Sequence, residues 1–394
     1  MSEYVMDLRK YVVPEIIVGR DARLLIGRYI QHFTSRKPMI VTDANVSKQM
    51  WFDQFMQEIK RHASSYVLFR DVTPNPKDTE AMAGAEIFRR EKCDLIIAVG
   101  GGSPMDCAKC ISIVSANGGN ILDYEGVDEI DLPGPPLICI PSTAGTSADV
   151  SQFAIILDTD THIKKAIISK KVVPDLALID PIPLTTMDME LTACTGMDAL
   201  THAVEAYVSS AHSSLTDMHA LEAIGLISGN LEKAASGART LKDLFQMMIG
   251  SIQAGIAFSN ASLGAVHAMA HSIGGLLDLP HGECNSILLE HVVSANFNAV
   301  SGKYRIIAEK MGILQENFSD AEVREKLTSK IGTMRANLGI KSNITIPCCD
   351  ITDIIRQLTE SAMDDPCMVT NPKKLTIAEV QDIYAKVIQC EPQK

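Results

Sequence analysis

The chain of 394 residues has no long apolar run, no cluster of basic residues and no regular cysteine framework. Its most apolar segments are broken by glycine, proline or charge well short of the roughly eighteen residues that a membrane span requires. The N-terminus carries acidic residues and no sustained apolar stretch, so we expect no signal peptide. A net charge of −12 argues against non-specific nucleic-acid binding, which needs a positive surface. These absences favour a soluble protein that acts on small molecules.

The ten cysteines are scattered, and a chain of this length needs no disulfide bonds to stabilise its core. We therefore expect reduced thiols and a cytoplasmic location. Cys107 and Cys110 form a C-x-x-C motif without a partner pair, which argues against a zinc knuckle. We predict that these two cysteines pack inside a helix.

The first half of the chain alternates short apolar strands with helical stretches, a pattern typical of a parallel sheet covered on both faces. From about residue 185 the strand signals fade, and apolar residues recur at three- and four-residue spacing. We predict an α/β domain over residues 1–184 and an all-helical domain over residues 185–394. The expected strands are residues 13–18, 38–42, 65–69, 95–99, 137–140 and 176–179, with a β-hairpin over 153–157 and 164–168.

A glycine-rich loop, residues 100–106 (GGGSPMD), follows one predicted strand. Ser103 suits a helix N-cap, Pro104 the first helical position, and Asp106 completes a capping box. Glycines before a helix N-terminus let a phosphate approach backbone N–H groups, although a tight strand–helix turn explains the loop as well. The spacing G-x-G-x-x-G is not fulfilled, and Lys109 lies too far along the helix for a P-loop, which argues against a kinase or ATPase.

Two further segments suit a nucleotide. Asp43 ends a predicted strand and suits hydrogen bonds to an adenosine ribose, or equally a helix N-cap. In the usual dinucleotide fold this acid follows the glycine loop, whereas here it precedes it, so the fold would be a variant. The small, hydroxyl-rich loop 141–147 (PSTAGTS) is suited to phosphate or ribose contacts.

Three of the ten histidines, His267, His271 and His281, lie in one segment rich in glycine and alanine. The first two share a helix face, and two glycines and a proline are expected to break the helix and fold the third back toward them. Asp198 and His202 are also four residues apart. Together with His267 and His281 they offer one oxygen and three nitrogen ligands, which suits Zn²⁺ or Fe²⁺. Satisfied core histidines are the alternative, and helical spacing alone would pair His267 with His271.

Several segments, in the same order over essentially the whole chain, resemble the iron-containing alcohol dehydrogenase family. They are residues 73–76 (TPNP), 100–106 (GGGSPMD), 141–149 (PSTAGTSAD), 177–209 (ALIDPIPLTTMDMELTACTGMDALTHAVEAYVS), 264–285 (GAVHAMAHSIGGLLDLPHGECN) and 364–372 (DDPCMVTNP). The resemblance implies a variant Rossmann-like domain followed by a helical domain, the dehydroquinate synthase-like architecture, with the active site in the cleft between them. It also implies NAD, Fe²⁺ with Zn²⁺ as a substitute, and a homo-oligomer, a dimer or larger.

The resemblance also implies roles for single residues. The metal ligands would be Asp198, His202, His267 and His281, and His271 would lie beside the metal and serve in proton transfer. The cofactor-contacting positions would be Asp43, Asn75, Gly101, Gly102, Ser103, Asp106, Ser142, Thr143, Lys164 and Leu184.

The implied function is NAD-dependent interconversion of a primary alcohol and its aldehyde by metal-assisted hydride transfer. Phe153 and Phe258 would make the substrate pocket partly apolar and favour simple primary alcohols, although core packing explains Phe153 equally well. The alternatives are a 1,3-propanediol, lactaldehyde or 4-hydroxybutyrate dehydrogenase of the same family. Two other classes are a metal-dependent hydrolase and a nucleotide-binding protein with a structural metal.

Overall fold

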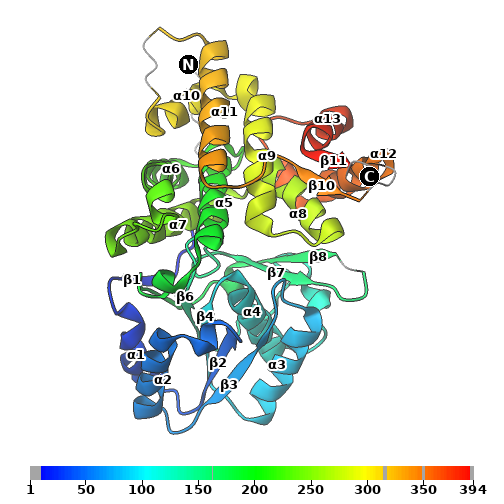
Figure 1. Ribbon diagram of the computed structural model, residues 1–394. Coiled ribbons are helices and arrows are strands. Elements are labelled where there is room, and N and C mark those ends of the chain that lie inside the picture. Colours follow the sequence, from blue (N-terminus) through cyan, green and yellow to red (C-terminus); the bar gives the residue numbers. More distant parts are fainter. Residues whose placement is uncertain (1–9, 162, 314–316, 348–350, 391–394) are drawn as a thin grey trace.

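The computed structural model describes residues 10–161, 163–313, 317–347 and 351–390. The first nine residues, on which the expectation of no signal peptide partly rests, and Cys348 and Cys349 lie outside these ranges. The chain folds into an α/β part formed by its first half and a helical part formed by its second half, stacked one above the other in Figure 1.

A six-stranded sheet lies at the centre of the α/β part, in the order β1-β9-β6-β4-β2-β3. All neighbouring strands pair in parallel, as the sequence predicts. Every residue of β4 is buried, which is expected of a central strand covered on both faces. The strands are β1 (Glu15–Val18), β2 (Pro38–Asp43), β3 (Val67–Val72), β4 (Leu95–Gly100), β6 (Leu137–Pro141) and β9 (Leu176–Ile179).

Alternate side chains of each strand enter different cores. Met39 and Val41 of β2 pack with α3 and α4, whereas Ile40 between them packs with α1 and α2 on the other face. Each face of the sheet is thus covered by one pair of helices (Figure 1). The helices are α1 (Ile26–His32), α2 (Met50–His62), α3 (Asp78–Arg90) and α4 (Gly102–Asn117).

The direction in which successive strands are added across the sheet reverses between β2 and β4. From β2 it moves outward to the edge strand β3, and from β4 it moves the other way to β6. The carboxyl ends of β2 and β4, at Asp43 and Gly100, therefore border the crevice at which open α/β sheets bind ligands.

A second, three-stranded sheet lies between the two parts of the molecule (Figure 1). β7 (Phe153–Leu157) and β8 (Lys164–Ile168) form the predicted antiparallel hairpin. The short β5 (Gly126–Val127) pairs with β8 in parallel. The hairpin of β7 and β8 thus lies next to the helical part of the molecule (Figure 1).

The second half is mainly helical, with α5 and α9 near its centre (Figure 1). It also contains a small parallel sheet of β10 (Ile344–Ile346) and β11 (Ile388–Cys390), so the expectation of an all-helical domain misses one short element. The helices are α5 (Met189–Val208), α6 (Ser214–Ala234), α7 (Leu241–Ala261), α8 (Ala265–Leu277), α9 (His281–Asn296), α10 (Ser301–Lys310), α11 (Asp320–Asn337), α12 (Ile351–Asp364) and α13 (Ile377–Val387).

Two predicted helix boundaries are wrong. α4 begins at Gly102 with Gly101 as its N-cap, so Ser103 is not the cap, and no side chain caps this helix. Pro104 still falls in the first turn, where its missing N–H costs nothing. The expected break at Gly274 is also absent, since α8 continues to Leu277 and ends at a left-handed Asp278 with φ 50°.

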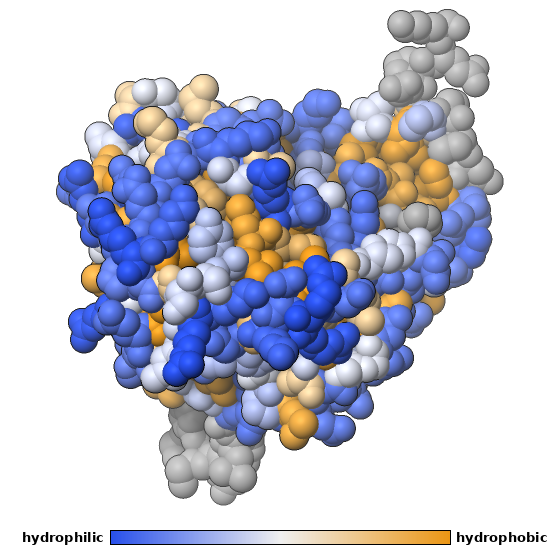
Figure 2. Space-filling model, turned by 90° about the horizontal axis from the view of Figure 1, so that it is seen from below, coloured by the Kyte–Doolittle hydropathy of each residue, from blue (hydrophilic) through white to orange (hydrophobic). Residues whose placement is uncertain are grey.

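The surface and the thiols add two observations. The face in Figure 2 is mostly hydrophilic, with hydrophobic residues gathered near its centre and upper right. Among the described helices, none has the length and apolarity needed to cross a bilayer. The eight described cysteines are unpaired, and Cys107 and Cys110 lie buried inside α4, as predicted.

Candidate metal and cofactor site

One pocket contains residues from both parts of the chain. Its lower wall comes from the loops after the sheet strands and from the β7–β8 hairpin, and its upper wall comes from the helices. It is lined on the α/β side by Asn75, Gly102, Ser103, Asp106, Phe153 and Lys164, and on the helical side by Asp198, His202, Phe258, Leu263, His267, His271, His281, Asp365 and Cys367.

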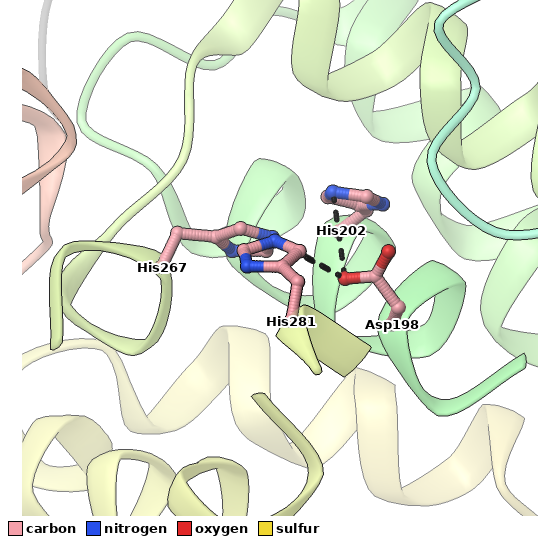
Figure 3. Close-up of side chains that lie close together, drawn as sticks. All are labelled: Asp198, His202, His267 and His281. Atoms are coloured by element: carbon pink, nitrogen blue, oxygen red, sulfur yellow. Dashed lines mark ion pairs between the residues drawn. The ribbon is translucent and has the colours of Figure 1, made fainter. Parts of the chain in front are cut away.

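The four predicted metal ligands converge on one point (Figure 3), and all four line this pocket. Asp198 and His202 project from one face of α5, His267 from the first turn of α8, and His281 is the first residue of α9. The Nε2 atoms of His202, His267 and His281 lie 3.8, 3.7 and 3.7 Å from Asp198 Oδ1.

These separations fit a bound divalent ion. They are too long for hydrogen bonds, whereas four atoms bound tetrahedrally at about 2.1 Å lie roughly 3.4 Å from one another. One ligand atom from each residue lies within 4.8 Å of the others. A buried carboxylate surrounded by three imidazole nitrogens is a donor set that Zn²⁺ or Fe²⁺ accepts.

The protonation states of three of the four groups agree with this fit. Burial alone would raise the pKa of Asp198, but His202, His281 and His267 beside it hold the pKa well below its usual range. Burial lowers the pKa of His202 to about 4 and that of His281 well below its ordinary value. Burial alone would lower the pKa of His267, but its contacts with Asp198 and Glu205 raise it to about 9. Near neutral pH the set thus holds an ionised carboxylate, two neutral imidazoles and one charged imidazole, whose proton a divalent ion would displace.

His271 lies beside this set and outside it, as the family resemblance implies. Its ring stacks on that of His281 with centroids 5.2 Å apart. Its Nδ1 lies 2.8 Å from Asp365 Oδ2, so the other ring nitrogen, Nε2, is left for exchange with the pocket. Burial alone would raise the pKa of Asp365, but His271 and the backbone N–H of Cys367 bring it down to about 2.

The predicted phosphate loop is built for close backbone contact. A Cβ atom on Gly101 would lie 3.2 Å from Thr143 Cγ2, and one on Gly102 would lie 3.0 Å from Thr146 Cγ2. The Ser142 N–H donates to Gly100 O at 2.8 Å, which joins the two loops. Because no side chain caps α4, its first N–H groups are available to an anion. This arrangement fits the pyrophosphate of a dinucleotide.

Asp43 is not the N-cap of a helix, since Asn45 holds that position before the next short helix, and its role at the ribose stays a prediction. Its Oδ1 accepts the N–H groups of Asn45 and Val46, both at 2.8 Å, and so caps the following turn. Its Oδ2 faces the glycine loop, since a Cβ on Gly100 would lie 3.5 Å from that oxygen.

The other predicted cofactor residues divide into two groups. Asn75, Asp106 and Lys164 line the pocket. Burial raises the pKa of Asp106 to about 7 and lowers that of Lys164. Leu184, by contrast, is 1% exposed in the core of the helical part and does not line the pocket.

Part of the pocket wall is aromatic. The rings of Phe153 and Phe258 have centroids 5.7 Å apart, and Phe258 stacks on His202 at 4.3 Å. Leu263 extends the same wall. A substrate held near the metal cluster would therefore meet an apolar surface.

Three further polar residues belong to the site although no sequence motif singles them out. Glu205 contacts His267, Asp365 contacts His271, and Asn285 Nδ2 donates to Asp198 Oδ1 at 2.7 Å. Glu205 comes three residues after His202, and Asn285 comes four residues after His281. This helical spacing places each of them on the same helix face as a predicted ligand, which is a signal that the sequence does contain. Asp365 has no such spacing, and its signal is its place in the family-resembling segment 364–372.

Comparison with known families gives two adjoining matches. The family described as "Iron-containing alcohol dehydrogenase" matches residues 14–181. The family described as "Fe-containing alcohol dehydrogenase family, C-terminal" matches residues 192–388.

Individual proteins match over almost the whole chain. A 1,3-propanediol dehydrogenase from Citrobacter freundii is 37% identical over 95% of this chain and 97% of its own. An NAD-dependent methanol dehydrogenase from Bacillus methanolicus is 33% identical over 96% of this chain and 99% of its own. Among solved structures, a 1,3-propanediol oxidoreductase superposes with a TM-score of 0.91 at 36% identity and covers 96% of this chain and 99% of its own.

Proposed function

The chain belongs to the iron-containing alcohol dehydrogenase family, and from this premise we propose that it interconverts a primary alcohol and its aldehyde with NAD(H). One observation carries the proposal. The Asp/His₃ cluster and the uncapped glycine loop line opposite walls of the same pocket, so a metal-held substrate and a loop-held dinucleotide would meet.

We assign the metal ligands to Asp198, His202, His267 and His281, and Fe²⁺ or Zn²⁺ to the site. The cofactor residues are proposed to be Asp43, Asn75, Gly101, Gly102, Ser103, Asp106, Ser142, Thr143 and Lys164. Leu184 is proposed to support these residues through core packing. The proposed division into domains lies after residue 184.

When bound, the divalent ion supplies a Lewis acid for the alcohol oxygen, and NAD supplies the hydride acceptor. The chain's own residues position the two reactants and handle the proton. His271 lines the pocket with Nδ1 held by Asp365, so its Nε2 is placed to exchange the alcohol proton. Phe153 and Phe258 exclude water from the substrate side.

The aromatic wall supports simple primary alcohols such as butan-1-ol as substrates. A diol is the second candidate, favoured by the 37% identity to a 1,3-propanediol dehydrogenase. The unpaired thiols of the described residues support the proposal of a cytoplasmic location. A dimer or larger assembly is proposed because the family resemblance implies it.

The test is NADH formation from a panel of alcohols and diols, run with NAD and with NADP. The protein is first stripped of metal and then refilled with Fe²⁺ or Zn²⁺. Reduction of NAD that is lost on stripping and returns on refilling supports the proposal. Hydrolysis of an ester or amide without alcohol oxidation would contradict it.

A further inference from the structure

Glu205 is a buried carboxylate that touches a proposed metal ligand and has no role in the mechanism so far. It lies on α5 three residues after His202 and is 4% exposed. Its Oε2 lies 2.6 Å from His267 Nδ1. Its Oε1 accepts the backbone N–H of Val266 at 2.7 Å.

The same carboxylate therefore fixes the start of the helix that carries His267. α8 begins at Ala265, and its N-cap, Gly264, has no side chain to satisfy the first N–H groups. Glu205 supplies an acceptor for one of them and places negative charge at the positive end of the helix. A Cβ on Gly264 would lie 2.8 Å from Glu205 Oε1, so a side chain there would displace this oxygen from its contact.

The contact also decides which nitrogen of His267 carries a proton. A carboxylate oxygen only accepts hydrogen bonds, so Nδ1 of the ring must donate. The lone pair of the neutral ring is then on Nε2, the atom that lies 3.7 Å from Asp198 Oδ1 inside the ligand set. Glu205 would also place a second negative charge one imidazole ring away from a bound ion.

We propose that Glu205 is the positioning residue of the metal site: it holds His267 in the tautomer and orientation that bind the ion and so sets the affinity for metal. The inference rests on the proposed Asp/His₃ metal site. Carboxylates that hold a metal-binding histidine in this way typically change metal affinity about 10–100-fold when they are replaced.

A purely structural role, capping α8, is the competing explanation, and the chain offers a matched control. The N–H of Ala265, the residue before Val266, is accepted by Asn371 Oδ1 at 3.2 Å. Asn371 thus caps the same helix, and its side-chain hydrogen bonds run to Ala265, Asn296 and Lys373. Loss of Asn371 removes capping from α8 and leaves Glu205 with its histidine.

The experiment compares zinc affinity of metal-free wild type, E205Q and N371A by competition with a chromophoric chelator, with thermal unfolding of the metal-free proteins alongside. In E205Q the amide oxygen can still cap Val266, but the NH₂ group then faces His267 Nδ1 and demands the wrong tautomer. We expect the zinc Kd of E205Q to rise about 10–100-fold. The Kd of N371A should stay within about threefold of wild type even though its melting temperature falls.

An unchanged zinc Kd in folded E205Q overturns the inference, and so does an equal rise in N371A. If wild type itself binds no zinc, the proposed metal site is refuted, and the role of Glu205 is refuted with it. Zinc binding by wild type together with an unchanged Kd in E205Q refutes the role of Glu205 alone. Should E205Q not fold, the ¹H–¹⁵N imidazole spectrum of zinc-loaded wild type decides. A protonated Nδ1 and zinc-bound Nε2 on His267 support the inference, and the reverse assignment overturns it.

Discussion

Phe153→Asn should shift substrate preference from simple alcohols toward diols. Phe153 is half-buried at the pocket wall, and its ring packs against Phe258 at 5.7 Å between centroids. A second hydroxyl on the substrate would lose its water partners against this wall without gaining new ones. Leaving a polar group unpaired costs about 1–3 kcal/mol.

Asparagine at this position offers a donating NH₂ group and an accepting oxygen, and it removes apolar contact with an alkyl chain. A substrate CH₂ that is no longer buried loses about 0.8 kcal/mol, and the recovered hydrogen bond adds a similar amount. Together these changes alter relative transition-state binding by about 1.5 kcal/mol, which is roughly tenfold. The ratio of kcat/KM for 1,3-propanediol to that for butan-1-ol should therefore rise about tenfold.

The assay is initial-rate NADH formation with both substrates at fixed, saturating NAD. Phe153→Leu is the control, because it removes the ring and keeps the wall apolar, so its ratio should stay near that of wild type. A thermal scan confirms that both variants are folded. An unchanged ratio in Phe153→Asn would refute the pocket role and leave Phe153 as a packing residue of the hairpin.

Three further changes test other parts of the site. Asp43→Asn keeps a side-chain oxygen for the turn and removes the negative charge that would repel the 2'-phosphate of NADP. The ratio of kcat/KM with NADP to that with NAD should therefore rise about tenfold. A constant ratio would place Asp43 away from the ribose. Gly102→Val puts a Cβ 3.0 Å from Thr146 Cγ2, so NADH binding measured by fluorescence should weaken at least about tenfold, and unchanged binding would contradict the phosphate-loop assignment. Asp365 has a folded pKa of about 2, below the ordinary 3.8, so its contact with His271 stabilises the fold above about pH 4 and loses this effect as the pH falls toward 2. Asp365→Asn should therefore cost about 2 kcal/mol of unfolding free energy at pH 7 and progressively less below pH 4 in urea titrations. A pH-independent difference would be inconsistent with this contact of the ionised carboxylate.

The α/β part was predictable from the sequence because its signals are local. Runs such as residues 95–99 are apolar throughout, and a central parallel strand requires that pattern. The hairpin strands flank a turn rich in aspartate and threonine. The exact start of α4 was not predictable, since Gly101 and Ser103 are both acceptable caps and only the fit against the loop at Thr143 favours the glycine.

The site was predictable in part. Helical spacing brings Asp198 and His202 together without further information. The same spacing would have paired His267 with His271, and only the family pattern chose His281 instead. In the structure this choice fits, because α9 starts at His281 and directs its ring toward Asp198 from a different helix.

The contacts of Glu205 and Asp365 depend on how separate helices cross. Neither the crossing of α5 with α8 nor the approach of the segment after α12 is encoded in any local pattern. Leu184, a position implied by the family resemblance, lies in the core, and its contact with the cofactor stays a prediction.

The most direct test of the metal site is a crystal structure of the zinc-loaded protein with diffraction data collected on both sides of the zinc absorption edge. The account predicts one strong anomalous peak about 2.0–2.2 Å from Asp198 Oδ1 and from Nε2 of His202, His267 and His281. A zinc-loaded, active protein with no peak at this position, or with its peak elsewhere in the chain, would contradict it.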